Sequence, residues 1–206
     1  MKQKFSIFSF QFSIMLAAML LFAGCKDKKN MDNPFFSEWN TPYEIPDFSR
    51  IKTEHYMPAF MEGMKQQKEC IDNIANNSEE PTFGNTIIPY EYSGEMLQTV
   101  SAVFFNLSEC ENSPEMEAIA EEVTPLLSAH GDDIALNAKL FARIKAVYDQ
   151  RESLDLTPEQ MRLLEETYKG FVRGGANVPA DQQERFRQLN EQIASLTLRF
   201  AQNVNR

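Results

Sequence analysis

Cysteine and histidine are scarce in this chain, and their scarcity limits the chemistry that it can perform. Only three cysteines and two histidines occur among 206 residues. Three cysteines are too few for a disulfide framework, and most zinc sites need more histidine and cysteine ligands than this. The sequence also lacks the motifs His-Glu-x-x-His, Cys-x-x-Cys and Gly-x-Ser-x-Gly, and it has no glycine-rich phosphate loop. Spacing alone therefore identifies no catalytic and no metal-ligating residue.

Basic residues are outnumbered by acidic ones. Lysine and arginine together number 20, against 30 aspartates and glutamates, which gives a formal net charge of −10 and a sequence pI near 4.8. We expect no nucleic-acid partner, because phosphate contacts need a basic face. The length is that of about one domain, and the 43% of hydrophobic residues suffice for a core.

The start of the chain has the pattern of a secretory signal. Lys2 and Lys4 precede an apolar stretch over residues 5–23. Polar residues interrupt this stretch, whereas a membrane span needs about 20 apolar residues in a row. The stretch ends at Leu21-Phe22-Ala23-Gly24-Cys25, which resembles the lipobox of bacterial lipoproteins, where small residues precede an acylated cysteine. Phe22 stands where these proteins usually carry leucine.

This resemblance implies that residues 1–24 are a lipoprotein signal peptide, that Cys25 is lipidated, and that residues 25–32 form a polar tether. We expect export to the cell envelope, with acyl chains on Cys25 holding the protein on a membrane that faces the periplasm or the cell surface. The alternative is an ordinary cleaved signal in which Cys25 is incidental.

Residues 33–206 are expected to form an all-α domain of about six helices, entered through an extended aromatic arm. Three prolines keep the arm, Asn33–Ser49, extended or turn-like, and its five aromatic residues indicate that it packs along the domain surface. No segment shows a sustained alternation of apolar and polar residues, so strands are not predicted.

Apolar spacing and capping signals predict the separate helices. The first begins near Thr53 and presents one face with a gap at Gln67; the residues of this face are Tyr56, Phe60, Met64, Ile71 and Ile74. The second is expected at about Asn85–Leu107, or from Ile87 or Ile88, because Pro89 belongs in a first turn. The third begins at Ser113-Pro114, with a kink or break at Thr124-Pro125, and the fourth spans Asp132–Gln150. The fifth runs from the capping box Thr157–Gln160 to Gly174-Gly175, and the last begins at Asp181 and Glu184.

The cleanest amphipathic pattern lies in the last of these helices. Its apolar residues recur every three or four positions and are Phe186, Leu189, Ile193, Leu196, Phe200 and Val204. The pattern is still in register at Arg206, without a capping glycine. We therefore expect a domain that is truncated at its C-terminal end.

A few side chains could carry chemistry. His130 lies in Ser128-Ala129-His130-Gly131-Asp132-Asp133 and could be a general base or half of a metal site. The favoured interpretation is structural, with a helix starting at Asp132 or Asp133 and local hydrogen bonds for His130. Cys70 and Cys110 could pair in an oxidising compartment, although isolated cysteines more often act as small buried hydrophobes.

Paired glutamates recur along the chain, for example at Glu79-Glu80, Glu121-Glu122 and Glu165-Glu166. We interpret them as solvated helix faces or first-turn acids. A channel lined for cationic peptides is the alternative.

The sequence from Asn33 onward resembles the N-terminal part of peptidyl-dipeptidases (dipeptidyl carboxypeptidases), which are relatives of oligopeptidase A and thimet oligopeptidase. The matching segments occur in the family's order and are NPFF at Asn33–Phe36, IKTEHYMPAFMEGMKQQ at Ile51–Gln67, PTFGNTI at Pro81–Ile87, SGEMLQTVSAVFFNL at Ser93–Leu107, TPLLSAHGDDIALNAKLFARIKAVYDQR at Thr124–Arg151 and LLEETYKGFVRGGA at Leu163–Ala176. The SAHGDD cluster is part of the resemblance, which favours the structural interpretation of His130.

The resemblance implies an almost wholly helical, two-lobed zinc metallopeptidase that releases dipeptides from the C-termini of short peptides. The family's metal motif lies downstream of the region matched, so no catalytic and no metal residue is assigned to any position of this chain. The resemblance implies that this segment is the N-terminal helical lobe, which forms a channel wall and restricts access. We expect the 206-residue chain alone to be inactive and to need the missing C-terminal catalytic region. The alternative is a self-standing, non-catalytic helical lipoprotein that binds peptides or a partner protein.

Overall fold

The computed structural model describes residues 33–110 and 113–204, and all regular secondary structure in these residues is helical, without a strand. The all-α prediction is therefore confirmed. The described α-helices are α2 (Tyr56–Ala75), α3 (Ile88–Glu91), α4 (Glu95–Cys110), α5 (Pro114–Ala135), α6 (Ala138–Asp149), α7 (Pro158–Arg173) and α8 (Gln183–Val204). The predicted signal peptide, the predicted tether and Cys25 lie outside the described residues.

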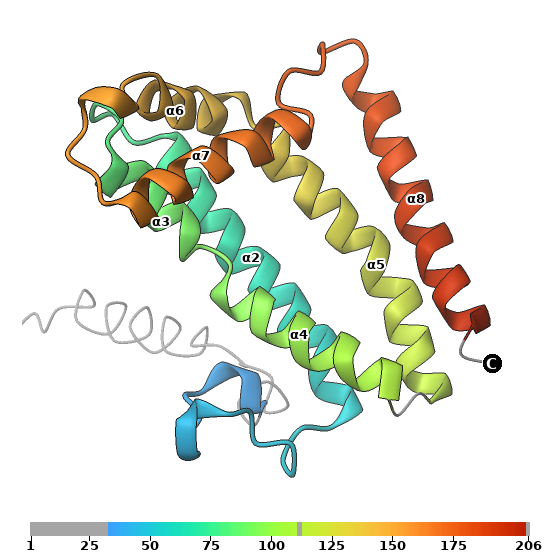
Figure 1. Cartoon of the computed structure of the whole chain (residues 1–206). Helices are drawn as coiled ribbons and strands as arrows, with labels where there is room; N and C mark the ends of the chain where they lie inside the picture. The colour runs from blue at the N-terminus through green and yellow to red at the C-terminus, as the bar shows by residue number, and fades with distance from the viewer. Residues whose placement is uncertain (1–32, 111–112, 205–206) are drawn as a thin grey trace, which may run out of the picture.

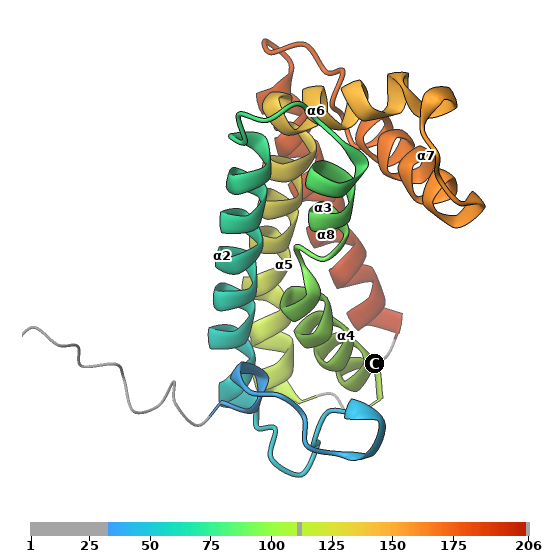
Figure 2. The same ribbon diagram turned by 90° about the vertical axis from the view of Figure 1, so that its left-hand side faces the viewer.

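Helices α2, α4 and α5 run alongside one another and enclose the first core cluster (Figures 1 and 2). The predicted face of α2 supplies much of it, since Tyr56, Phe60 and Met64 are all buried. The cluster also contains Phe35, Ala59, Val100, Val103, Phe104, Met116, Ala120 and Val123. Helices α2 and α4 approach closely at Gly63, where a Cβ atom would lie 3.0 Å from the Cα of Leu97. Glycine at this position therefore lets the backbones of the two helices approach closely, and a side chain there would be in tight contact with α4.

A second core cluster lies at the other end of α2, where α6 packs against α2 and α7 packs against α6 (Figures 1 and 2). Its buried residues are Ile71, Ile74, Phe83, Ile87, Leu140, Ile144, Val147, Leu164 and Phe171. The remaining two residues of the predicted α2 face, Ile71 and Ile74, thus belong to this cluster. Helix α2 therefore joins the two halves of the core.

The predicted caps at Ser113 and Thr157 are confirmed. Ser113 accepts a hydrogen bond from the amide of Met116 at 3.2 Å, which caps α5. At the start of α7, Thr157 and Gln160 form the reciprocal capping box. The helix ends at Arg173 with Gly174 as its C-cap, and Gly175 takes a φ of +103°, a conformation that favours glycine.

Two predicted helix boundaries are wrong. The predicted helix Asn85–Leu107 is split into a π-helical turn η5 (Phe83–Ile87), α3 and α4, with a turn at residues 92–94. A Cβ atom on Gly94 would meet Gln67 Nε2 at 2.4 Å, so this turn packs directly on α2. Helix α5 continues through Pro125 to Ala135, and the next helix begins only after the N-cap Asn137.

Pro125 lacks the amide that would donate to the carbonyl of residue 121, and its ring crowds that carbonyl. Glu121 lies on an exposed part of the helix, where water can hydrate that carbonyl. Consequently no helix starts at Asp132 or Asp133, and both residues lie in the last turns of α5.

The arm begins with the 3₁₀ turn η2 (Pro34–Phe36), which is fixed to the start of α2. The side chain of Asn33 donates to the carbonyl of His55 at 2.8 Å, and Phe35 is buried against Tyr56. Further along, the turn η3 (Pro42–Glu44) leaves the Tyr43 side chain 95% exposed. The arm therefore packs on the domain at its start but not along its whole length.

Candidate functional site

Within the SAHGDD cluster, His130 contacts helix α2. Its Nε2 lies 2.8 Å from Oε1 of Gln67 on α2. The Gln67 Nε2 donates to Ser93 Oγ at 3.4 Å, and Ser93 Oγ donates to the carbonyl of Tyr90 at 2.7 Å. Because Gln67 uses its amide group as a donor to Ser93, its oxygen faces His130, which fixes the proton of a neutral imidazole on Nε2.

Burial lowers the pKa of His130, and this effect exceeds the opposing influence of Asp133; Lys68 lowers it further. The lowered pKa favours the neutral imidazole, whose Nδ1 carries no proton when Nε2 donates to Gln67. Gln67 interrupts the apolar face of α2, and its hydrogen bonds to His130 and Ser93 connect α2 to α5 and to the turn before α4. The hydrogen bond spans 63 positions of sequence and is not the local contact that we expected.

A cavity of about 330 Å³ adjoins His130, and we call it the His130 cavity. It is lined by Gln67, Tyr90, Leu97, Leu127, His130, Gly131, Ile134, Ala135, Gly170 and Phe171. Gly131 and Gly170 lie on α5 and α7, and a Cβ atom on either would meet nothing within 4 Å. These two glycines are not required by close packing, and they leave the cavity wide. It has room for an apolar side chain, with Gln67 and His130 as polar groups at its wall.

The two aspartates of the cluster bind α8. Asp132 is 6% exposed and accepts a hydrogen bond from Asn190 Nδ2 at 2.6 Å. Asp133 Oδ1 lies 2.8 Å from Arg187 NH1. Both acids thus hold the last helix onto α5, which supports the structural interpretation of the cluster. Within residues 33–110 and 113–204, no group of three histidine, cysteine or acidic side chains could hold a metal ion.

Cys70 and Cys110 are both free, and both are exposed. The expectation that they act as small buried hydrophobes is therefore wrong. They lie on α2 and α4 and form no disulfide with each other.

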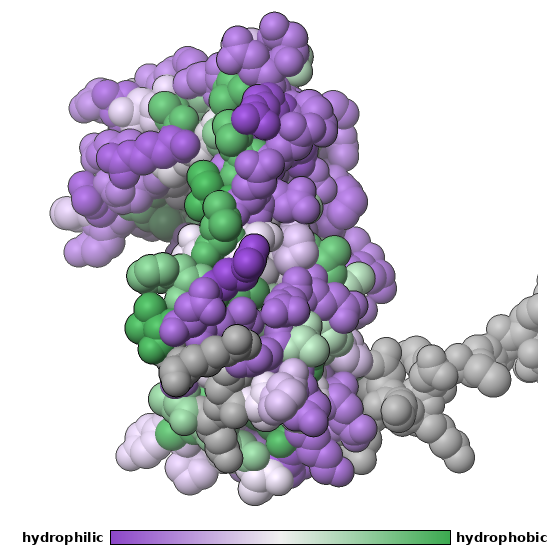
Figure 3. Space-filling view, turned by 90° about the vertical axis from the view of Figure 1, so that its right-hand side faces the viewer, coloured by the Kyte–Doolittle hydropathy of each residue, from purple (hydrophilic) through white to green (hydrophobic). Residues whose placement is uncertain are grey.

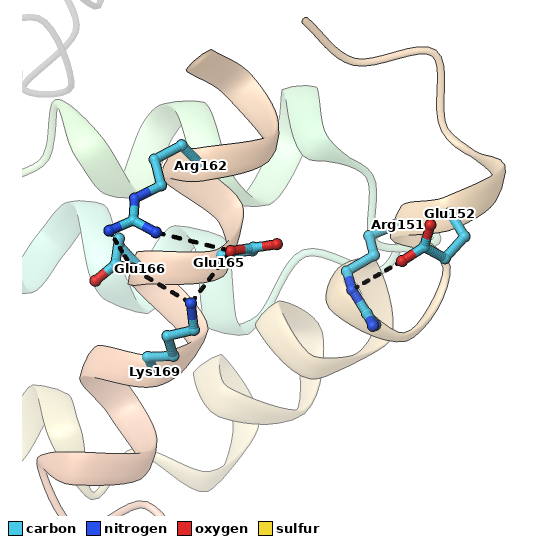
Figure 4. Close-up of polar contacts among 6 residues, drawn as sticks. All are labelled: Arg151, Glu152, Arg162, Glu165, Glu166 and Lys169. Atoms are coloured by element: carbon cyan, nitrogen blue, oxygen red, sulfur yellow. Dashed lines mark hydrogen bonds and ion pairs between the residues drawn. The ribbon is translucent and has the colours of Figure 1, made fainter. Parts of the chain in front are cut away.

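The paired glutamates of α7 belong to a network of ion pairs at the helix surface (Figure 4). Arg162 contacts Glu166 at 3.1 Å, and Lys169 contacts Glu165 at 3.1 Å and Glu166 at 3.3 Å. These side chains are between 34% and 68% exposed, so solvent screens the pairs and each contributes little to stability. This exposed network agrees with the interpretation of Glu165-Glu166 as a solvated helix face.

Arg143 on α6 is a buried charge that the sequence analysis missed. It is 7% exposed, and its guanidinium donates four hydrogen bonds to uncharged acceptors. The acceptors are the carbonyls of Asn77 and Glu79 and the side chains of Asn85 and Thr86. Arg143 therefore fastens the loop after α2, and the turn η5, to α6. A lone arginine within an amphipathic helix gives no sequence signal for this role.

No model of a protein family matches the chain, whereas individual relatives do. Dipeptidyl carboxypeptidase of Escherichia coli (strain K12) is 40% identical over 172 residues, which are 84% of this chain and 25% of that protein. Oligopeptidase A of the same organism is 24% identical over 174 residues, again 84% of this chain and 25% of the relative. The thimet-like oligopeptidase of Dictyostelium discoideum is 22% identical over 169 residues, 80% of this chain and 24% of the relative.

The described part of the chain is helical, and the chain resembles peptidases related to oligopeptidase A and thimet oligopeptidase. More narrowly, it is similar to the N-terminal portion of dipeptidyl carboxypeptidase and of oligopeptidase A, which confirms the resemblance found in the sequence. The chain spans about a quarter of the length of these relatives. No helix in the described part of the chain combines the length and the apolar character that crossing a bilayer requires.

Proposed function

We propose that this chain is the N-terminal part of a zinc metallopeptidase that releases C-terminal dipeptides from short peptides. The observation that carries the proposal is the 40% identity over 172 residues with the dipeptidyl carboxypeptidase of Escherichia coli. In this proposal, helices α2 to α8 form one wall of the substrate channel and restrict access to it. Folded proteins are excluded, and short peptides enter.

The chemistry is assigned to a C-terminal catalytic region beyond the segment that aligns with the relatives. The described residues do not fit a zinc ion, because they contain no group of three suitable ligands. The His130 pair with Gln67 supplies one neutral imidazole, which is too few ligands for a structural or a catalytic zinc site. Zinc would be supplied with its ligands by the catalytic region, and the chain alone would be inactive.

The proposal includes a lipid anchor. Acylation of Cys25 would hold the peptidase on a membrane of the cell envelope, facing the periplasm or the cell surface. The support is the sequence Leu21-Phe22-Ala23-Gly24-Cys25 at the end of an apolar stretch. Short peptides in the envelope would then be its substrates.

A second candidate function is a self-standing, non-catalytic lipoprotein that binds peptides or a partner protein. The His130 cavity favours it, since about 330 Å³ suffices for an apolar side chain of a peptide. In this case the chain would bind peptides without cleaving them, and it would melt cooperatively on its own.

A chimera tests the two candidates. Residues 33–204 of this chain replace the matched N-terminal quarter of Escherichia coli dipeptidyl carboxypeptidase, and dipeptide release from a short peptide is measured. We expect zinc-dependent activity from the chimera and none from the chain alone. A chimera that melts cooperatively but releases no dipeptide, or dipeptide release by the chain alone, contradicts the proposal.

A further inference from the structure

Helix α8 presents its apolar face to solvent. The face, which we call the α8 stripe, consists of Leu189, Ile193, Leu196, Phe200 and Val204, whose side chains are 40%, 61%, 61%, 70% and 66% exposed. None of the residues of α8 is fully buried. At 1.5 Å per residue the stripe is about 22 Å long. Figure 3 shows hydrophobic side chains running along this face of the molecule between hydrophilic ones.

The outward orientation of the stripe is fixed by polar contacts on the opposite side of α8. Asn190 donates to the buried carboxylate of Asp132, and Arg187 pairs with Asp133. Turning α8 to bury the stripe against α5 would leave Asp132 buried without its donor, which is costly for a carboxylate. Burying the stripe against α5 would therefore cost free energy, so the stripe stays available to another polypeptide surface.

A hollow extends the stripe onto the neighbouring helix. Glu109 of α4 and Phe200, Ala201 and Val204 of α8 line a depression of about 340 Å³. Apolar patches of this length exceed the scattered hydrophobic residues of an ordinary surface and mark places where another surface packs. The depression between two helix ends gives an incoming apolar side chain a place to insert.

Two observations indicate whether the α8 stripe is covered by a further part of the same peptidase or by a second copy of this chain. The chain covers 25% of the length of its relatives, so the matching peptidases carry about three times as much polypeptide beyond the region shared with this chain. A second copy of this chain is disfavoured, because each copy carries a formal net charge of −10 and two copies would repel each other.

We infer that the α8 stripe is the contact surface for the C-terminal portion of the peptidase, which covers the stripe with an apolar surface. The inference rests on the proposed function and adds the surface that joins the N-terminal lobe to the catalytic region. The contacts of α8 with Asp132 and Asp133 set the rotation of this helix about its axis. The stripe then faces outward and binds the C-terminal portion.

The stripe variant carries Ile193→Gln, Leu196→Gln and Phe200→Gln within the chimera with Escherichia coli dipeptidyl carboxypeptidase. The control variant carries three substitutions at exposed apolar residues on three other helices, namely Met61→Gln, Ile88→Gln and Val172→Gln, whose side chains are 51%, 40% and 37% exposed. We expect the stripe variant to lower the midpoint of thermal unfolding of the chimera by about 5 °C or more, and the control to lower it far less. In the isolated full-length chain, both variants should shift the midpoint by about 1 °C or less.

The outcomes separate the inference from the proposed function. Equal melting of the stripe and control variants in the chimera overturns the inference, even where the chimera is active. A chimera that melts cooperatively without activity counts against the proposed function alone, because its melting still reports on the stripe. Dimerisation of the isolated chain at about 100 μM that the stripe variant abolishes would assign the stripe to a second copy, and this also overturns the inference.

Discussion

Replacing Arg143 by methionine should destabilise the chain far more than replacing an exposed arginine. The guanidinium donates to the carbonyls of Asn77 and Glu79 at 2.8 Å each, and to two side-chain oxygens at 3.1 Å and 3.3 Å. Methionine matches the aliphatic part of arginine but donates no hydrogen bond. The substitution therefore isolates the polar contribution of a residue that is 7% exposed.

The magnitude follows from the contacts. Hydrogen bonds from a charged donor contribute about 1.5 to 3 kcal/mol each, and the two shorter ones give the larger share. The desolvation of a buried charge and the unpartnered buried Nε of Arg143 offset part of this gain. We expect a net loss of about 3 kcal/mol in the free energy of unfolding. With a urea m-value of about 2 kcal/mol per M, the midpoint of urea unfolding should fall by about 1.5 M.

Urea unfolding of the full-length chain, followed by circular dichroism, measures this loss. The matched control is Arg162→Met on α7, whose side chain is 68% exposed, and it should cost less than about 0.5 kcal/mol. An Arg143→Met midpoint within about 0.3 M of the wild type would refute the role assigned to Arg143.

Three further predictions follow from the local structure. The lowered pKa of His130 means that the unfolded state binds more protons near pH 6, so stability should fall as the pH drops below about 6.5; His130→Gln should remove this part of the pH dependence, and an unchanged profile would contradict the burial of the imidazole. Gly131→Ala and Gly170→Ala should each raise stability by about 0.5 to 1 kcal/mol in urea unfolding, whereas Gly63→Ala should lower it, because only at Gly63 would the new Cβ meet a backbone atom at 3.0 Å. Thr157→Ala should cost about 1 kcal/mol by removing the cap of α7, and no change in the melting midpoint would count against the capping box.

The sequence predicted the buried faces of individual helices well, because periodicity reports directly which side of a helix is apolar. All five residues assigned to the face of α2 are buried. The caps at Ser113 and Thr157 were also predictable, since they depend on residues only three positions apart. Signals of this kind are local and need no knowledge of the partner helix.

Helix continuity was predicted less well, since it depends on what packs against each position. Pro125 was expected to interrupt α5, but only one backbone hydrogen bond is lost there, at an exposed carbonyl. Conversely, Gly94 gave no clear signal for a break before α4. The break follows from the contact of Gly94 with Gln67, on a helix that lies far earlier in the chain.

The candidate site and the α8 stripe show the same limit. The sequence marked Gln67 as a gap and His130 as part of a cluster, but it did not place them in contact. The α8 pattern predicted an amphipathic helix correctly, yet periodicity does not say which surface covers the apolar face. In the structure, polar contacts from Asp132 and Asp133 hold the opposite face of α8, and the stripe remains exposed.

The most direct test of the central claim is the intact mass and zinc content of the native protein, purified from the membrane fraction with an antibody to residues 33–204. The account predicts a lipidated polypeptide several times heavier than 23.7 kDa that contains zinc and releases dipeptides from short peptides. A native species of slightly less than 23.7 kDa, without zinc and without this activity, would contradict it.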